Sequence, residues 1–247
     1  MSQWFEDESF WIDMYPFLFP PERINQADFE VEKLLNLIEF SGSAVLDLCC
    51  GPGRHSISLA RRGFKVTAVD RTPIYLEMGK KKALSDRLDI EFVLQDMISF
   101  KRPNSFDLAL SLWTSFGFFD RKEDDVLVLD NIFQSLKSGG IFFIDLFGKE
   151  TLAEDFQPTT SEELADGSIL MQRHEIFDNW TRIKNEWTII KNNTSKSYTF
   201  HHTLYSGQEL MDRLERVGFI DIRLFGDFEG NEYGLDAPRL IAVAQKP

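Results

Sequence analysis

Short apolar runs alternate with amphipathic stretches over the first 150 residues of the chain. Five runs have the length of buried strands, at 44–48, 64–69, 90–94, 106–112 and 141–146. Four stretches repeat their apolar residues at helical spacing, at 28–40, 56–62, 73–84 and 124–136. In the first of these, Val31, Leu34 and Ile38 form the apolar face, and we expect Glu30 to be exposed. Continuous apolar strands between helices predict a parallel sheet covered on both faces, and therefore an α/β fold of Rossmann type.

After Lys149 the pattern becomes that of an antiparallel sheet. Three segments alternate apolar and polar residues, at 169–177, 182–190 and 197–205. Asn and Asp pairs stand between them and are typical of tight turns, at 178–179 and 192–193. We therefore predict a small antiparallel β insertion over 150–205.

Helical spacing returns after Ser206, where Glu209 completes a capping box and Gly218 ends the helix. Two last strands follow at 220–225 and 240–244. Residues 1–42 hold many aromatic side chains before the first strand, and we expect them to form a helical and aromatic cap. The chain as a whole, 1–247, is interpreted as a single domain.

Composition narrows the functional classes. The net charge of −13 repels phosphate backbones and anionic membranes, which disfavours a DNA or membrane partner. No apolar run reaches the about 18 residues that a membrane span needs, and the first residues lack the basic region of a signal peptide. Cys49 and Cys50 are adjacent, so no disulfide is expected. These features predict a cytoplasmic protein. Its assembly is left open as a monomer or a homodimer.

The clearest chemistry lies where the first two strands end. Asp47 ends the first strand, the turn from Gly51 to Gly53 opens a helix, and Asp70 ends the second strand. Glycines let the backbone approach a bound nucleoside closely. An acid at the end of the second strand reaches a ribose diol and accepts two hydrogen bonds. The spacing therefore indicates a nucleoside cofactor at the carboxyl ends of the strands.

A nicotinamide-dependent dehydrogenase is the main alternative within this fold. Its fingerprint, G-x-G-x-x-G, places pyrophosphate at a helix N-terminus. Here Ser56 occupies the third glycine position, and the carboxylate of Asp47 would repel a pyrophosphate. The same carboxylate suits the cationic ammonium and sulfonium groups of S-adenosylmethionine. Charge therefore favours methyl transfer over hydride transfer.

The run DLCCGPGRH and the later TSFGFF resemble the class I S-adenosylmethionine-dependent methyltransferases, in particular a bacterial small-molecule branch. The resemblance covers nearly the whole chain and implies a seven-stranded sheet with the last strand antiparallel. It implies S-adenosyl-L-methionine as cofactor and S-adenosyl-L-homocysteine as product. The cofactor-binding residues that it implies are Asp47, Cys49, Gly51, Gly53, Asp70, Arg71, Asp96, Met97, Leu112 and Thr114.

Within that set, the resemblance implies that Asp70 holds the ribose and that Asp96 and Met97 hold the adenine. Leu112 and Thr114 would lie beside the sulfonium. Cys49 stands where the family often has the first glycine of the turn.

Methyl transfer from a sulfonium is an in-line displacement, which needs alignment and exclusion of water, and a base only where the acceptor must lose a proton. Three residues are candidate catalytic groups: His202, Tyr205 and Asp145. His201 and His202 point to opposite faces of a strand, and we expect His202 to face the pocket. Trp180 is expected to contact the acceptor. The four histidines show no zinc-type spacing, so no metal is predicted.

Three other functions remain open: a protein methyltransferase, an RNA methyltransferase, and a non-catalytic subunit that keeps the cofactor fold. The segment Ser111-Leu112-Trp113-Thr114 differs from the Asn/Asp-Pro-Pro-aromatic tetrad of enzymes that methylate planar amino groups. Lys80-Lys81-Lys82 lies on a predicted helix and is interpreted as a solvated face. The sequence thus favours an enzyme that methylates oxygen, nitrogen or carbon of a small-molecule acceptor.

Overall fold

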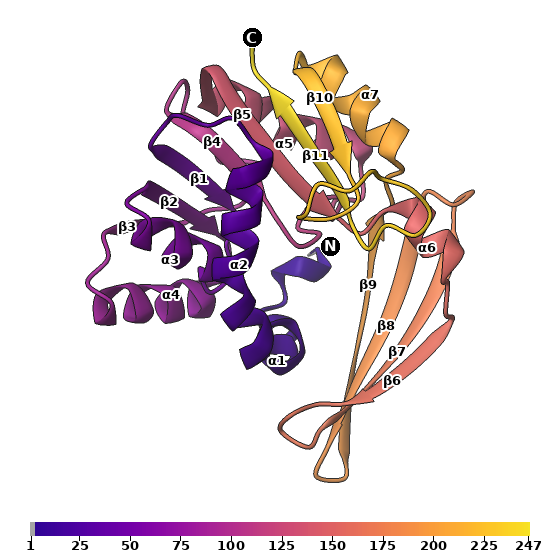
Figure 1. Cartoon of the computed structure of the whole chain (residues 1–247). Coiled ribbons are helices and arrows are strands. Elements are labelled where there is room, and N and C mark those ends of the chain that lie inside the picture. The colour runs from indigo at the N-terminus through magenta and orange to yellow at the C-terminus, as the bar shows by residue number, and fades with distance from the viewer. Residues whose placement is uncertain (1–2) are drawn as a thin grey trace.

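The computed structural model describes residues 3–247. Its centre is a seven-stranded sheet in the order β10-β11-β5-β4-β1-β2-β3 (Figure 1). Strand β11 is antiparallel to both of its neighbours, whereas the pairs among β1 to β5 are parallel. The predicted Rossmann-like sheet with its last strand antiparallel is confirmed. The strands are β1 (Ala44–Leu48), β2 (Lys65–Asp70), β3 (Ile90–Leu94), β4 (Phe106–Ser111), β5 (Leu136–Leu146), β10 (Ile220–Phe225) and β11 (Leu240–Gln245).

Helices cover both faces of this sheet. One face packs against α2 (Pro21–Leu37), α3 (Arg54–Arg61) and α4 (Pro73–Ser85), with Leu34, Leu59 and Leu76 in its core. The other face packs against α5 (Lys122–Ser135) and α7 (Gly207–Val217), with Leu129 and Leu214 in its core. Helix α7 begins at the predicted capping box of Ser206 and Glu209. No helix within residues 3–247 is long and apolar enough to cross a bilayer.

Helix α2 differs from its prediction in extent and in burial. It begins at Pro21, because proline is well tolerated in the first turn of a helix. The expectation that Glu30 is exposed was wrong: it retains 6% exposure. Its carboxylate pairs with Arg54 and His55 from the first turn of α3, so neighbouring donors compensate the buried charge.

The insertion forms a second, four-stranded antiparallel sheet that projects away from the first (Figure 1). It follows α6 (Lys149–Glu154) and consists of β6 (Thr159–Glu163), β7 (Ile169–Phe177), β8 (Arg182–Lys191) and β9 (Thr194–Thr203). The sequence predicted three strands and missed β6, because its polar residues are mostly exposed and show no apolar alternation. The predicted turns at 178–179 and 192–193 are present, with left-handed backbone at all four residues.

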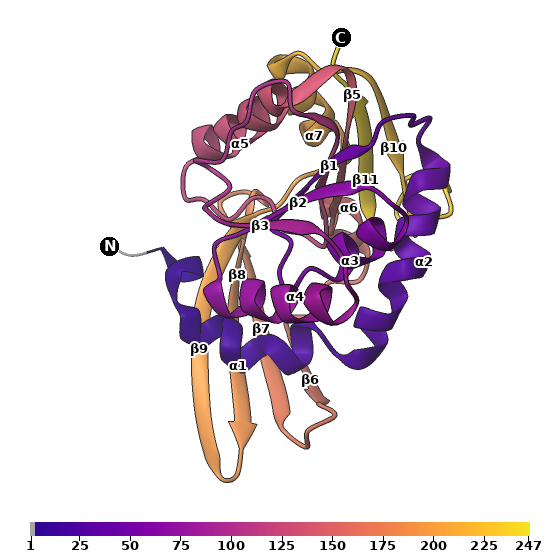
Figure 2. The same cartoon turned by 90° about the vertical axis from the view of Figure 1, so that its left-hand side faces the viewer.

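The N-terminal segment lies between the two sheets (Figure 2). It consists of a short 3-10 helix, η1 (Trp4–Glu6), and α1 (Glu8–Leu18). Toward the first sheet, the Tyr75 hydroxyl of α4 donates to the Trp11 carbonyl at 2.6 Å. Toward the second, Phe10 and Met14 are buried against Phe200 and its neighbours. This segment therefore joins the two sheets.

Candidate active site

A cavity of about 640 Å³ opens at the carboxyl ends of β1, β2 and β4. This volume lies within the range of small-molecule sites. Three parts of the chain line it: the strand ends, the N-terminal segment and the inner face of the second sheet. Lining residues from the last two parts include Trp4, Phe10, Trp11, Gln172, His174, Asn185, Trp187, Phe200 and His202, and Arg23 of α2 lines the cavity as well.

The turn after β1 follows a left-handed path. Cys49, Gly51 and Gly53 all have positive φ, of 62°, 56° and 79°. A Cβ on Gly51 would also lie only 2.9 Å from the Phe19 ring, so glycine is required there by both backbone and space. Gly53 precedes α3 and is not among the lining residues, while Cys49 lines the cavity with its sulfur 3.5 Å from that of Met97.

The structure brings the predicted acids together on one wall of the cavity. Asp47 is buried, which raises its pKa, and accepts a hydrogen bond from the Ser56 hydroxyl. Burial likewise raises the pKa of Asp70, whose two oxygens accept the N–H groups of Gly51 and Thr72, each at 2.8 Å. Each oxygen keeps a further lone pair for a ligand.

Asp96 and Met97 follow β3 at the same wall, beside Arg71. The Nε atom of Arg71 lies 3.7 Å from an oxygen of Asp96. Leu112 and Thr114 also line the cavity, after β4. Of the ten predicted cofactor-binding residues, Gly53 is thus the one outside the lining, where it shapes the turn.

Asp145 does not line the cavity, although the sequence made it a candidate catalytic group. It is fully buried and accepts from the Arg239 Nε at 2.6 Å and from the Trp113 amide at 3.0 Å. These bonds support Trp113 and Thr114, which have the left-handed φ values of 57° and 59°. Two consecutive non-glycine residues in this region are strained and need such support. Asp145 therefore shapes the cavity wall from behind.

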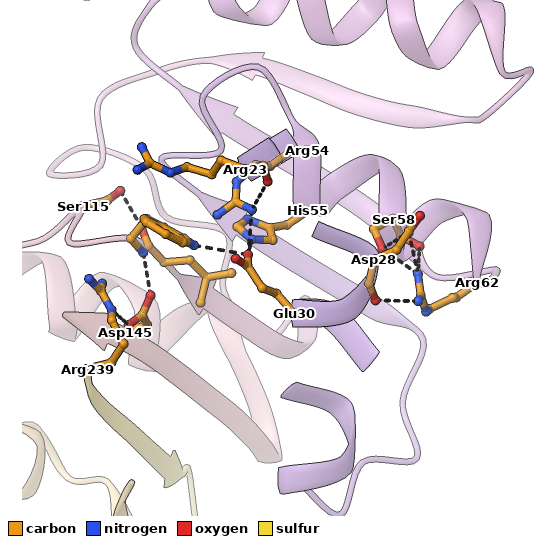
Figure 3. Close-up of polar contacts among 12 residues, drawn as sticks. Arg23, Asp28, Glu30, Arg54, His55, Ser58, Arg62, Ser115, Asp145 and Arg239 are labelled. Carbon is orange, nitrogen blue, oxygen red and sulfur yellow. Dashed lines mark hydrogen bonds and ion pairs between the residues drawn. The ribbon is translucent and has the colours of Figure 1, made fainter. Parts of the chain in front are cut away.

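A charged cluster between α2 and α3 was missed by the sequence reasoning (Figure 3). One oxygen of Glu30 meets Arg54 at 2.6 Å, His55 at 2.7 Å and the Trp113 indole N–H at 3.2 Å. Although burial opposes ionisation, His55 and Arg54 hold the pKa of Glu30 below its usual range. Glu30 lies on the buried face of α2, together with Ala27, Val31 and Leu34. This helical spacing marks it as an acid within an apolar stripe.

Three guanidinium groups surround Trp113. Those of Arg23, Arg54 and Arg239 lie 4.6, 4.9 and 5.2 Å from the centre of a Trp113 ring. Cations are attracted to the face of an indole at these distances. Arg23, Arg54 and Trp113 all line the cavity, so this wall is positively charged beside the acids of the strand ends.

On the second sheet, His202 faces the cavity, and burial lowers its pKa to about 4. His201 points to the other face and its Nε2 atom contacts Asp120 at 2.6 Å. The structure does not bring Tyr205 or Trp180 into the lining: the Tyr205 hydroxyl donates to buried Asp125 at 2.6 Å, and Trp180 is 44% exposed. Sequence reasoning missed a polar pair of this wall, in which the His174 Nδ1 and Asn185 Oδ1 atoms are 2.7 Å apart.

Unpaired hydrogen-bond donors gather on this one cavity. Within residues 3–247, eight buried side-chain polar atoms have no hydrogen-bond partner. Five of them are N–H groups of lining residues: Trp4 Nε1, Arg54 Nη2, Arg71 Nη1, Asn185 Nδ2 and Trp187 Nε1. Because each unpaired buried donor costs about 1–3 kcal/mol, their concentration here indicates ligands that bring hydrogen-bond acceptors. Among the same described residues, no cluster of three or more His, Cys, Asp or Glu side chains is arranged to hold a metal.

Known methyltransferases share this sequence pattern and this fold. Residues 45–140 match the model of a methyltransferase domain. A putative methyltransferase of Bacillus subtilis, YqeM, is 28% identical over 82% of this chain and 83% of its own.

Two solved structures share the fold. An S-adenosylmethionine-dependent methyltransferase from Clostridium acetobutylicum superposes with a TM-score of 0.78 at 15% identity, over 96% of this chain and 97% of its own. The amino pentose methyltransferase CalS10 of Micromonospora echinaspora, solved with S-adenosylmethionine bound, gives 0.66 at 16% identity, over 92% and 91%. Residues 45–140 therefore match a methyltransferase domain, and the chain as a whole has the fold of S-adenosylmethionine-dependent methyltransferases.

Proposed function

We propose that the enzyme methylates an oxygen, nitrogen or carbon atom of a small, uncharged molecule. One observation supports this most: the wall opposite the strand ends consists of aromatic rings and neutral hydrogen-bonding groups. Among the lining residues, Asp155 is the one charged side chain that comes after β5. Charged or polymeric acceptors would meet no matching charges there.

The strand-end wall fits S-adenosylmethionine, which supplies a methyl group on a sulfonium. Asp70 has lone pairs free for the ribose hydroxyls, and the Gly51 turn that it holds lines the same wall. We propose that Asp96, Met97 and Arg71 hold the adenine. The unpaired Nη1 of Arg71 suits an acceptor atom of the nucleoside.

The remaining cofactor residues would hold the methionine portion. Asp47, with the turn of Cys49, Gly51 and Gly53, would accept the ammonium group, since a buried carboxylate favours a cationic partner. Leu112 and Thr114 would border the sulfonium from the end of β4. The resemblance to the family suggested these roles, and the shared wall supports them.

The acceptor would lie against the second sheet and η1. Since a carbonyl oxygen only accepts, the His174–Asn185 contact has His174 Nδ1 as the donor. Asn185 keeps an unpaired N–H beside it, and the indole N–H groups of Trp4 and Trp187 are unpaired as well. This wall therefore offers three donors to an oxygen-bearing molecule.

Alignment and water exclusion are what the chain must supply, and together these can lower a barrier by about 7–11 kcal/mol. Where the acceptor loses a proton, we propose His202 as the base, because its pKa of about 4 keeps it neutral at neutral pH. Tyr205 and Asp145 are bonded to Asp125 and Arg239 instead, away from the cavity. The unpaired cysteines fit the cytoplasmic location that we also propose.

The test is methyl transfer from radiolabelled S-adenosylmethionine to four acceptor panels: neutral phenols and sugars, charged amino acids, peptides, and tRNA. We expect label in a neutral small molecule. Incorporation confined to peptides or tRNA, or the absence of transfer to every panel by protein that binds the cofactor, would contradict the proposal. Calorimetry with nicotinamide dinucleotide should show no binding.

A further inference from the structure

One nitrogen of the Arg54 guanidinium lies at the cavity wall without a hydrogen-bond partner among the described residues. The Arg54 side chain is only 4% exposed, and its Nη1 atom donates to Glu30 at 2.6 Å and to the Arg23 carbonyl at 2.9 Å. Its Nη2 atom has no partner among the described residues. A buried guanidinium with an unpaired N–H, at the surface of a cavity, is arranged to receive an acceptor atom from a ligand.

Arg23 adds a positive charge without a matching acid. Its Nη1 atom donates to the carbonyls of Phe17 at 3.1 Å and Leu18 at 2.6 Å, and no carboxylate within residues 3–247 lies at ion-pair distance. By contrast, Glu30 pairs with Arg54, and Asp145 pairs with Arg239. The three guanidiniums around Trp113 thus face two carboxylates, which leaves the group one positive charge in excess.

Asp47, the next acid along this wall, does not neutralise this excess positive charge. Asp47 accepts from Ser56 and lies at the end of β1, where we propose the ammonium group of the cofactor. Arg54 directly follows the glycine turn of that strand, and Arg23 lies at the start of α2. Both guanidiniums are therefore at the end of the cavity that would hold the methionine portion, which bears one ammonium and one carboxylate.

We propose that Arg23 and Arg54 form a two-arginine site for the α-carboxylate of the cofactor, with Glu30 and Trp113 as positioning residues. The inference rests on the proposed cofactor placement. Arginine forks match the two oxygens of a carboxylate, and the bonds are charge-assisted. An acceptor carboxylate fits less well, because the acceptor wall presents the uncharged groups of Asn185 and Trp187 rather than guanidinium groups.

The test compares two ligands that differ only by this carboxylate: S-adenosylhomocysteine and its decarboxylated analogue, S-adenosyl-3-thiopropylamine. Calorimetry on the full chain should show at least about tenfold tighter binding of S-adenosylhomocysteine. In Arg23→Met, the affinity for S-adenosylhomocysteine should fall by at least about tenfold, with little change for the analogue. Arg54→Met should behave likewise, with melting curves recorded because it leaves Glu30 without its closest partner.

Arg61→Met is the matched control, since Arg61 lies on the same helix as Arg54 and pairs with Asp28 and Asp86, none of which lines the cavity. It should keep the ligand preference of the unaltered protein. Equal affinities for both ligands in the unaltered protein, or a loss shared by both ligands in Arg23→Met, would overturn the carboxylate site alone. Failure to bind either ligand would overturn the proposed cofactor placement as well.

Discussion

Asp70 performs two tasks with one carboxylate. Its oxygens fix the turn after β1 through Gly51 and, we propose, accept the ribose hydroxyls. Asp70→Asn keeps the size of the side chain but removes the charge and replaces one acceptor oxygen by a donor. We expect the affinity for S-adenosylhomocysteine, measured by calorimetry, to fall by at least about tenfold.

Asp107→Asn provides the matched control for this change. Asp107 also accepts two backbone N–H groups, of Ser43 and Ala44, but does not line the cavity. Both variants should lose some thermal stability, and only Asp70→Asn should lose cofactor affinity. Equal affinities in the two variants would contradict the ribose role.

His202 and His201 are neighbours in the chain with different surroundings. His202→Ala should lower the methyl-transfer rate and leave S-adenosylhomocysteine binding unchanged, whereas His201→Ala should alter neither. Burial lowers the pKa of His202 from 6.5 to about 4, so the folded protein binds its proton more weakly than the unfolded chain does. Stability from this residue is therefore complete above pH 6.5 and lost as the pH falls toward 4.

The pH profile of the rate separates a base from a residue that only fills space. Where the acceptor must lose a proton, the acid limb assigned to His202 should lie near pH 4 and vanish in His202→Gln. An acid limb near pH 6.5 that survives this substitution would exclude His202 as the base.

The residues at the strand ends could be predicted from the sequence, because the position of each in the fold follows from the strand that precedes it. Asp47, Asp70 and Asp96 follow apolar runs directly, and parallel strands bring their carboxyl ends to one edge. Arg23 and Glu30 reach the same site only because α2 packs on α3, a contact between segments distant in the chain. No local pattern encodes that packing, although the buried spacing of Glu30 hinted at it.

Whole elements followed the hydrophobic pattern wherever one face of a strand or helix is buried. The sheet strands other than β5, and α4, match their predicted ranges closely, because burial imposes the period. Strand β6 lies at the edge of its sheet with mostly exposed residues, so no such period arises. Strand β5 begins at Leu136 rather than near 141, since an irregularity in its pairing with β4 accommodates the two glycines.

Helix α5 and the segment after β9 meet through one buried hydrogen bond, from Tyr205 to Asp125. Burial raises the pKa of Asp125 to about 7, so stability from this carboxyl is complete below pH 3.8 and lost as the pH rises to 7. Asp125→Asn keeps an oxygen for Tyr205 and cannot ionise. We expect it to be more stable than the unaltered protein by at least about 1 kcal/mol at pH 8 in urea denaturation.

The gain should grow between about pH 4 and pH 7 and stay constant above it, because Asp125 has its raised pKa only in the folded state. Asp124→Asn, on the neighbouring residue, should show no such trend. A gain that is independent of pH would mean that ionisation of Asp125 is not its source.

At the scale of the molecule, the cavity depends on contacts that link distant parts of the chain. Tyr198 of β9 bonds Asp13 of α1, and Tyr75 of α4 bonds the same helix from the other side. The sequence indicated an aromatic N-terminal cap, and an insertion in which His202 faces the pocket. It did not indicate which other inner-face residues would do so, since the register and tilt of a second sheet arise from packing over long sequence separations.

Arg23 belongs to both halves of the cavity. Through the carbonyls of Phe17 and Leu18 it holds the last turn of α1, the helix whose Phe10 and Trp11 border the acceptor half. A carboxylate bound to the same guanidinium would therefore also stabilise α1, which forms part of the wall of the acceptor half. We therefore expect cofactor binding to stabilise the helix that borders the acceptor half of the cavity.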